Sequence, residues 1–401
     1  MPSTAVQSKQ FRPATVPAGL AESWIELATT VEELQAHLAE WEDLTCEAIE
    51  INAYYEPWLL IPALQHTSAG LDVTVALIYR AIPEHNEKQL IGLFPLERHR
   101  PTLRQPYPQV SLWQHDYCYL ATPLIRRGFA AQCWELLLDW LKTDRHLGGA
   151  LDLSMFPAEG PVYQHLVDQM RQRRSISFCY EVYTRAYFWR RENGDSYITN
   201  ALSSRKQRDL RRKWRRLEDL GKLEFRTLSE PAVLDQWIDD FIRLEASGWK
   251  GERSTAINCK PGGRECMTSA LRDAFARGQL LLTGLFLNDE PIAMRCSFVT
   301  APGSFFFKPA YNEDYAQYSP GVHVELETIR LLHERTAISW MDSCTSPDNV
   351  LLNQIWMERR TYQTLLIATR GLTASFCLGV IRPALRWFSR SFRKARMSVE
   401  R

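Results

Sequence analysis

The sequence predicts a two-domain protein of the α+β class, and three observations lead to this prediction. The chain has 401 residues, which is more than a single hydrophobic core usually serves. Hydrophobic residues make up 45% of it and charged residues 24%, as in ordinary globular proteins. Helical and strand patterns are mixed in both halves, and in the second half three strands follow the helices in close succession.

In the first half, helices and strands are interspersed without a short repeat. Apolar residues from Val31 to Leu44 recur every three or four positions, which predicts one amphipathic helix. Residues 73–79 and 90–96 are short apolar runs on either side of a polar stretch, and they predict a hairpin. Residues 129–141 predict a buried helix, and residues 151–156 predict a strand.

A charged, glycine-containing stretch at 190–196 predicts the boundary between the two domains. We therefore divide the chain into a flexible tail (1–20), a first domain (21–190), a second domain (191–370) and a basic amphipathic helix (371–401). The first and second domains have a similar mix of elements, which is compatible with a duplicated fold.

The second domain is predicted to have a strand–loop–helix junction near its centre. Helices are predicted at 202–220, 232–246, 264–276, 320–332 and 350–356. Strands are predicted at 280–287, 292–299, 304–308, 338–341 and 362–368. The junction therefore falls between the third strand and the helix that begins at Pro320.

Composition excludes several classes of function. Lys and Arg total 48 against 47 acidic residues, so the net charge of +1 predicts no global polyanion partner. The nine cysteines include no CxxC pair and no paired Cys/His spacing, so we expect no metal site and reduced thiols. The sequence lacks an apolar leader and a run long enough to span a membrane, which predicts a cytoplasmic protein.

The junction at Tyr311–His323 is the most informative local feature. Ser319 is expected to cap the following helix, and Pro320 suits its first turn. Gly321 lets the backbone approach a ligand closely, and the N–H groups of a helix start favour an anion such as a pyrophosphate. An interpretation of equal weight is that Ser-Pro-Gly simply marks the start of a helix.

The run Arg205–Arg216 holds eight basic residues in twelve positions. On a helix, these charges surround one apolar stripe. Such a surface can bind the phosphates of a nucleotide cofactor, RNA or an anionic lipid surface. The interpretation that we favour is simpler, a solvated helix whose arginine stems cover the core.

The segment Glu245–Gly251 places a tryptophan and a lysine between two glycines directly after a helix. Glycines allow a tight loop over a cleft, in which Trp249 supplies a flat wall next to Lys250. A helix that ends at Gly248 with a buried Trp249 explains the same pattern equally well.

A polar cluster at Asp342–Asp348 follows a predicted strand, where the sheet holds side chains rigidly. Asp342 can orient a base or a substrate amine, and Cys344 or Ser346 can return a proton to a leaving group. A capping aspartate and a small buried cysteine are the alternative. His323 is a further candidate base, but it shares a polar helical face with Glu327, Arg330 and Glu334, and such faces are usually solvated.

Taken together, these segments resemble the CelD/BcsL family, GNAT-like proteins named for a link to cellulose or exopolysaccharide biosynthesis. The resemblance covers residues 22–370. It rests on Asn52–Trp58, Leu93–Leu96, His115–Leu124, Leu202–Arg212, Ser247–Gly251, Ser319–Gly321, Met341–Cys344 and Trp356–Arg360.

The resemblance implies two tandem GNAT-like domains with mixed, mostly antiparallel sheets, the second of which binds acyl-CoA. The CoA pyrophosphate is then expected at Gln317, Tyr318, Ser319, Gly321 and Val322. The usual pattern there is Gln/Arg-x-x-Gly-x-Gly/Ala, whereas this chain has its glycine one place late and His323 where a small residue is usual.

The implied reaction is acyl transfer to an amine or hydroxyl, on a sugar or an envelope or exopolysaccharide precursor. Glu245 or Asp342 is expected to accept the acceptor's proton, and Cys344 to return one to the CoA thiolate. Trp249, Lys250 and His323 are expected to contact the acceptor.

Two other functions fit the same fold. Fem-type transferases use aminoacyl-tRNA, for which the basic run at 205–216 is suited, although no long heptad segment is present for their coiled-coil arm. A non-catalytic binding or scaffold protein is the other.

The apolar and basic residues of 376–396 fit either a peripheral membrane contact or a helix packed on its own domain.

Overall fold

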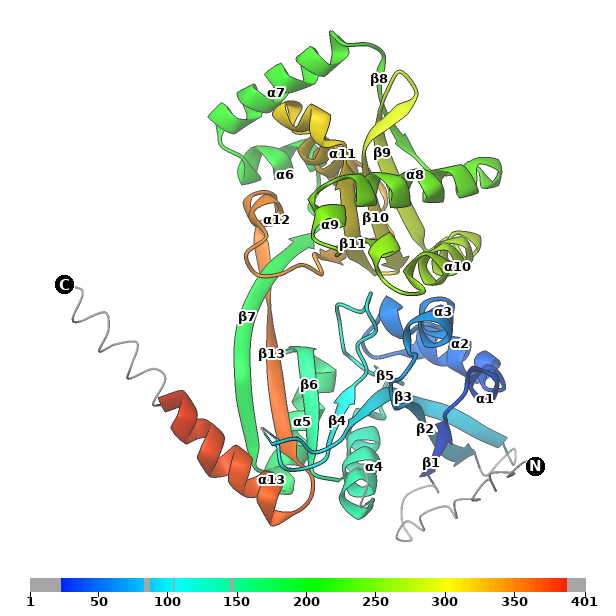
Figure 1. The fold of residues 1–401 in the computed structure, drawn as a ribbon, viewed down its shortest axis with the longest axis vertical. Helices are drawn as coiled ribbons and strands as arrows, with labels where there is room; N and C mark the ends of the chain where they lie inside the picture. The colour runs from blue at the N-terminus through cyan, green and yellow to red at the C-terminus, as the bar shows by residue number, and fades with distance from the viewer. Residues whose placement is uncertain (1–22, 83–86, 104, 145–147, 388–401) are drawn as a thin grey trace, which may run out of the picture.

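The fold is that of a computed structural model, which describes residues 23–82, 87–103, 105–144 and 148–387. Within these residues, thirteen strands form one mixed sheet flanked by helices (Figure 1). The strand order is β1-β2-β3-β4-β6-β13-β7-β12-β11-β10-β9-β8, and β5 pairs with β3 beside this path. The predicted α+β class is confirmed.

The first half contains the predicted hairpin, helix and strand, together with elements that were not predicted. Its elements are β1 (Ser23–Ala28), α1 (Val31–Gln35), α2 (Leu38–Glu47), η1 (Ala53–Tyr55), α3 (Pro57–Thr67), β2 (Val73–Ile82), β3 (Glu87–His99), β4 (Gln109–Leu112), β5 (Leu124–Ile125), α4 (Ala130–Thr143), β6 (Ala150–Pro157), α5 (Pro161–Gln172) and β7 (Ser177–Trp189).

The second half follows the predicted order of helices, three strands, helix, strand, helix and strand, except that a strand at 223–227, which was not predicted, lies between two of the helices. Its elements are α6 (Gly194–Ala201), α7 (Ser204–Glu218), β8 (Leu223–Thr227), η2 (Pro231–Val233), α8 (Leu234–Ser247), α9 (Trp249–Glu252), η3 (Ile257–Cys259), α10 (Gly263–Ala276), β9 (Leu280–Leu287), β10 (Glu290–Thr300), β11 (Gly303–Tyr311), η4 (Glu313–Tyr318), α11 (Pro320–Glu334), β12 (Trp340–Asp342), α12 (Val350–Ile355) and β13 (Glu358–Ala368). The chain continues through α13 (Leu372–Phe376) and η5 (Cys377–Ile381).

Each half contains one parallel strand pair. In the first half, residues 109–111 of β4 pair with residues 150–152 of β6. In the second half, residues 303–305 of β11 pair with residues 340–342 of β12. A parallel pair requires a crossover connection, which α4 supplies in the first half and α11 in the second. The two halves therefore repeat one β–α–β arrangement.

The two halves also exchange strands at the middle of the sheet. β13 is the last strand of the chain, yet it lies between β6 and β7 and pairs antiparallel with both. β7 pairs with β13 along most of its length and with β12 through residues 187–189. Figure 1 shows these two long strands side by side, reaching from the first half into the second.

The largest apolar core crosses from one half to the other. The ring of Tyr54 contacts those of Phe298 in β10 and Phe305 in β11, and the ring centroid of Trp58 lies 4.9 Å from that of Phe298. α3 of the first half packs on α10 of the second. Side chains of this size dominate core energetics, so the halves are held together by apolar packing as well as by strand exchange.

One local prediction needs correction. The apolar pattern at Val31–Leu44 forms two helices, because the chain breaks at Ala36 and His37 between α1 and α2. At the predicted boundary 190–196, α6 begins at Gly194, and Asn193 caps it by accepting from the Ser196 amide. The strands β7 and β8 and the helix α6 were not predicted. The predicted tail at 1–20 lies outside the described residues.

The strand exchange predicts that the first half does not fold without the last strand. A fragment that ends at residue 190 lacks β13, which leaves β6 without a partner on one side and β7 without its longest pairing. We expect differential scanning calorimetry to show no cooperative unfolding transition for this fragment. Co-expression with residues 191–401 should restore a transition. A fragment that melts cooperatively by itself would show instead that residues 21–190 are an independent domain.

Candidate functional site

The strand–loop–helix junction of the second half lies where two strands separate. β11 and β12 are parallel neighbours only through residues 303–305 and 340–342, and β11 then continues to Tyr311 without β12. The chain next forms η4, turns at Ser319 and enters α11. The loop therefore stands at the open end of a pair of diverging strands, a place where α/β sheets commonly bind ligands.

The predicted donor residues all lie in this turn. Gln317 and Tyr318 end η4, and Ser319 has a left-handed backbone with φ of 58°. The expectation that the Ser319 side chain caps α11 is wrong, since it makes no capping hydrogen bond. The Lys213 ammonium of α7 instead donates to the Ser319 hydroxyl over 3.0 Å. A lysine is thus held against the loop.

Gly321 and Val322 form the first turn of α11. A Cβ atom built on Gly321 would approach only the ring of Tyr311, at 3.8 Å, so there is open space in front of this backbone. The amides of Val322 and His323 donate to the Ser319 carbonyl over 3.0 and 3.3 Å. The amide of Gly321 comes before these two donors, at the very start of the helix, where an N–H group has no carbonyl of the helix to donate to.

His323 was expected on a solvated helical face, but the structure places it beneath the loop, where it is buried. It is 4% exposed, and its ring meets Trp214 of α7 edge-on with centroids 5.3 Å apart. Burial lowers the pKa of His323 to about 4, outweighing the opposing effect of a hydrogen bond with the Tyr318 backbone. Its Nε2 atom has no hydrogen-bond partner among the described residues. The imidazole is therefore neutral at physiological pH and supports the packing of α7 on α11.

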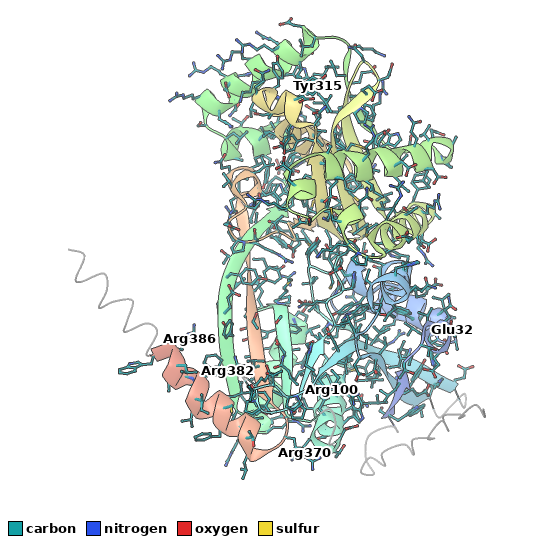
Figure 2. All side chains as sticks on the ribbon, in the orientation of Figure 1. Glu32, Arg100, Tyr315, Arg370, Arg382 and Arg386 are labelled. Carbon is teal, nitrogen blue, oxygen red and sulfur yellow. The ribbon has the colours of Figure 1, made fainter. Side chains whose placement is uncertain are left out.

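The basic helix α7 flanks the loop 317–322, which we call the donor loop because the predicted donor residues lie in it. α7 packs on η4, which carries the labelled Tyr315 in Figure 2. Leu210 and Leu217 form its buried side. The other side exposes six arginines, namely Arg205, Arg208, Arg211, Arg212, Arg215 and Arg216. Any polyanionic part of a ligand at Ser319 would meet this cationic surface.

Glu245 lies on the opposite side of β11 from α11, at the end of α8. Its side chain is fully buried, and one carboxylate oxygen accepts a hydrogen bond from the Lys308 ammonium over 2.8 Å. The other oxygen accepts the Ile257 amide at 2.8 Å. A buried carboxylate held in this way is fixed in position next to β11.

β11 carries a bulge immediately before Lys308. Cys296 of β10 pairs with Lys308 and Ser297 pairs with Phe306, which leaves Phe307 without a partner in β10. Bulges re-aim side chains and backbone groups next to active sites. Here the bulge brings Lys308 to the face of the sheet on which Glu245 lies.

Asp342, at the end of β12, is engaged in an internal network. The Arg185 guanidinium of β7 pairs with it, with Nε 2.6 Å from Oδ1 and a hydrogen bond of 2.8 Å to Oδ2. The Tyr362 hydroxyl of β13 and the Cys344 amide also donate to this carboxylate. Burial acts to raise the pKa of Asp342, but the attraction of Arg185 outweighs it, so the pKa lies below the ordinary value. The carboxylate is therefore ionised, and Arg185 and Tyr362 hold it in place.

Tyr119 of the first half is linked to Asp342 through Arg185. Arg185 donates to the Tyr119 carbonyl over 2.7 Å. Burial raises the pKa of Tyr119, and the nearby Glu245 and Cys344 raise it further. Burial also raises the pKa of the Cys344 thiol, whose backbone is left-handed with φ of 50°. Sequence reasoning missed Tyr119, Arg185 and Lys308; Tyr119 lies within the quoted motif His115–Leu124, whereas nothing in the sequence marks the other two.

The remaining predicted residues, Trp249 and Lys250, begin the short helix α9, and their side chains lie outside the described part of the chain. Gly251 is required at this bend, because a Cβ there would lie 2.0 Å from the Ala246 carbonyl oxygen. A Cβ on Gly248 would meet the Glu313 carboxylate at 2.9 Å, so this bend adjoins η4. The loop at 248–251 therefore borders the donor loop, as an acceptor-binding segment would require.

The first half does not repeat this open junction. After its parallel pair, the Gln114 side chain donates to the Ser154 carbonyl at 2.6 Å and so bridges β4 and β6. Trp113 is fully buried and its carbonyl accepts the Tyr55 hydroxyl at 2.9 Å. The following segment enters the interface with the second half, where Tyr117 and Tyr119 contact Phe307. The first half thus closes its own strand junction and contributes side chains to the other one.

Comparison with known proteins gives one family-model match, and it lies in the second half. Residues 204–349 match the family model described as "Acetyltransferase (GNAT) domain". No curated protein matches the chain significantly.

Solved structures that are similar in fold include the following two. FemX aligns with a TM-score of 0.53 at 8% identity, over 82% of this chain and 95% of that one. A conserved protein of unknown function from Bacteroides thetaiotaomicron VPI-5482 aligns with a TM-score of 0.51 at 10% identity, over 82% and 97%. At these identities the likeness shows a shared fold alone. Among the described residues, no cluster of His, Cys, Asp and Glu is arranged to hold a metal ion.

The buried ion pair predicts a large effect of removing one partner. Replacing Arg185→Met leaves the Asp342 charge buried without its cation, which should lower the free energy of unfolding by about 3–5 kcal/mol. Urea denaturation followed by circular dichroism measures this change. The matched control is Arg98→Met, whose partner Asp72 is solvent-exposed, for which we expect about 1 kcal/mol or less. Equal effects of the two substitutions would contradict the structural role given to Arg185.

The depressed pKa of His323 predicts a pH-dependent stability. The unfolded histidine binds a proton near pH 6.5 and the folded one only near pH 4, so acidification through this window favours the unfolded state. Replacing His323→Phe keeps a ring against Trp214 and removes the titrating group. Between pH 7 and pH 4.5 the wild type should therefore lose about 2 kcal/mol more unfolding free energy than the variant. Parallel urea titrations at the two pH values measure the difference, and identical losses would refute a buried neutral His323.

Proposed function

We propose that the protein is an acyl-CoA-dependent acyltransferase whose donor site lies in the second half. One observation carries the proposal: the loop 317–322 stands at the open end of diverging parallel strands, with space before Gly321 and Lys213 held at Ser319. The match of residues 204–349 to a GNAT acetyltransferase domain supports the same assignment.

The residues at this loop suit the chemistry of CoA. Lys213 and the first-turn amide of Gly321 offer positive charge and a hydrogen-bond donor for a pyrophosphate. The exposed arginines of α7 are placed for the additional phosphate of the nucleotide. β11 has no pairing with β12 beyond Phe305, and the bulge at Phe307 lies in this stretch, between Phe305 and the loop.

In the proposed reaction, the acceptor's nitrogen or oxygen bonds to the acyl carbon, the carbon–sulfur bond breaks, and the acceptor loses a proton. Glu245 is the residue that we assign to receive this proton, directly or through a water, since Lys308 and Ile257 hold it beside the bulge. The unpaired position at Phe307 is where a backbone N–H would stabilise the developing oxyanion.

The structure changes the roles that we propose for the other two predicted catalytic residues. Asp342 is a positioning residue, because Arg185 lowers the pKa of its carboxylate and so makes it a poor base, while the carboxylate links Arg185, Tyr362 and the Cys344 amide. Cys344 keeps its proton at neutral pH because burial raises its pKa, which also makes it a weak acid. We therefore assign Cys344, together with Tyr119, to donate a hydrogen bond toward the departing sulfur.

For the acceptor, we propose a hydroxyl-rich molecule such as a sugar or an envelope or exopolysaccharide precursor, as the CelD/BcsL resemblance suggests. A polar surface hollow beside the end of α8 supports this class of acceptor. It is lined by Asp239, Arg243, Ala246, Ser247, Asn258 and Arg264. These side chains offer several hydrogen-bond donors and acceptors, as carbohydrate binding requires, and they adjoin the loop at 248–251.

An aminoacyl-tRNA donor is the second candidate, because the exposed arginines of α7 form a cationic surface larger than one CoA needs. The fold shared with FemX is compatible with this donor. The two candidates differ in what α7 must bind, so titration with each donor separates them.

The test is calorimetric titration of the full-length protein with acetyl-CoA, which should give saturable binding. Gly321→Trp should abolish binding because it fills the space before the loop, whereas Gly321→Ala, whose methyl group meets only Tyr311, should weaken it far less. Melting temperatures verify that both variants fold.

The same titration with tRNA tests the second candidate. If CoA is the donor, the wild type should not bind tRNA saturably, and Arg208→Glu/Arg215→Glu should weaken acetyl-CoA binding, because it reverses two of the charges placed for the nucleotide phosphate. If tRNA binds instead, and this double variant weakens it by ten-fold or more, the acyl-CoA proposal is wrong. A folded protein that binds neither donor would point to a non-catalytic role.

A further inference from the structure

The C-terminal helix, residues 372–387, presents an apolar face to solvent. It consists of α13, η5 and the helical residues 382–387. Its inner side is buried against the end of the sheet through Ala374, Cys377 and Leu378. The sequence analysis left two interpretations open, and the structure shows that the helix packs on its own domain with one side only.

The outer side of this helix carries large apolar residues that the fold leaves exposed. The exposed fractions are 89% for Leu372, 57% for Phe376, 51% for Val380, 40% for Ile381, 62% for Leu385 and 64% for Trp387. Leu372, Phe376 and Val380 follow each other at four-residue spacing, which places them on one face. Single exposed apolar residues are common on proteins, but a continuous row of this kind marks an interaction surface.

The neighbouring strand β7 extends this surface. Ile176, directly before β7, and Tyr180 and Val182, within it, are 40%, 61% and 58% exposed. They adjoin the helix, since Arg386 donates to the Cys179 carbonyl at 2.6 Å and a Cβ on Gly379 would lie 3.3 Å from Ile176. We call the exposed apolar residues of the helix and of β7 the C-terminal apolar face.

Positive charge accompanies the C-terminal apolar face. Figure 2 shows Arg382 and Arg386 on the helix and Arg370 just before its start. Residues 371–401 contain seven basic residues and a single acidic one, Glu400, which gives this segment a net charge of +6. Among the described residues, no helix is long and apolar enough to cross a membrane.

We propose that the C-terminal apolar face docks on the surface of a lipid bilayer that contains anionic phospholipids. A helix with an apolar outer row and basic flanks lies in the plane of such a surface, with its apolar side chains among the acyl chains and its cations at the headgroups. Each Lys or Arg near an anionic surface adds to this attraction. The basic residues beyond Trp387, which are Arg390, Arg393, Lys394, Arg396 and Arg401, supply more of the same charge.

A second copy of the chain is a less suitable occupant. Two copies that paired through this face would bring two segments of net charge +6 together, and like charges repel at this distance. An anionic bilayer supplies the opposite charge together with an apolar phase.

The proposal goes beyond the acyl transfer proposed above and does not depend on it. Figure 1 places α13 at one end of the molecule, whereas α7 and α11 of the donor loop lie at the other. Docking through the C-terminal apolar face would therefore leave the donor loop open to solvent.

Vesicle flotation of the full-length protein tests the proposal. We expect the protein to float with vesicles of phosphatidylcholine mixed with phosphatidylglycerol and to remain at the bottom with phosphatidylcholine alone. Phe376→Asp/Val380→Asp should reduce the vesicle-bound fraction by roughly ten-fold or more, because two apolar side chains leave the bilayer and two negative charges are added. Both residues are more than half exposed, so the fold should not change.

The matched control is Val350→Asp, an exposed valine at the start of α12 that should float like the wild type. Circular dichroism and acetyl-CoA titration establish that each variant is folded, and they keep this result separate from the donor proposal. Equal flotation of wild type and double variant would overturn the inference. So would a failure of the wild type to float, and a dimer in light scattering that the double variant loses would then identify a second copy as the occupant.

Discussion

The ion pair between Arg185 and Asp342 joins the parts of the molecule on which the site depends. Arg185 belongs to β7, Asp342 to β12, and Tyr362 of β13 donates to the same carboxylate, so one buried charge pair links the three strands at the middle of the sheet. Arg185 also donates a hydrogen bond to the Tyr119 carbonyl, which holds the segment that follows Trp113 in the first half. Buried charges are stable only when their hydrogen-bonding capacity is met, so these four segments must be in place together. The position at which β11 and β12 diverge follows from this arrangement.

The two halves show how one β–α–β arrangement can serve two purposes. In the second half, the chain beyond the parallel pair leaves room before Gly321, and Lys213 is drawn from another helix to the loop. In the first half, Gln114 bridges the corresponding strands and the chain beyond Trp113 runs into the interface. Tyr117 and Tyr119 of that segment then pack on Phe307, at the bulge. The first half therefore closes its own strand junction and contributes Tyr117 and Tyr119 to the surroundings of the bulge in β11.

Sequence reasoning succeeded wherever burial of one face imposes a local period. The hairpin β2–β3, the helices α4, α8, α10 and α11 and the strands β9 to β11 were predicted on this basis. It failed for β7, because residues such as Tyr180 and Val182 lie exposed and the strand shows no alternation of apolar and polar residues. It failed for pairing over long distances as well. The contact of Lys213 with Ser319 joins positions 106 apart, and no spacing rule predicts that the basic helix and the donor loop meet.

The net charge of +1 is the sum of two strongly basic segments and an acidic remainder of the chain. α7 carries eight basic and two acidic residues, and residues 371–401 carry seven and one, so each segment has a net charge of +6. The rest of the chain must then carry −11 to reach the total of +1. Charges at opposite ends of a molecule are screened from each other beyond about 10 Å of electrolyte, so each cationic segment acts on its own surroundings. A composition that excludes a global polyanion partner is therefore compatible with two local ones, a phosphate-bearing donor at α7 and an anionic surface at the C-terminal helix.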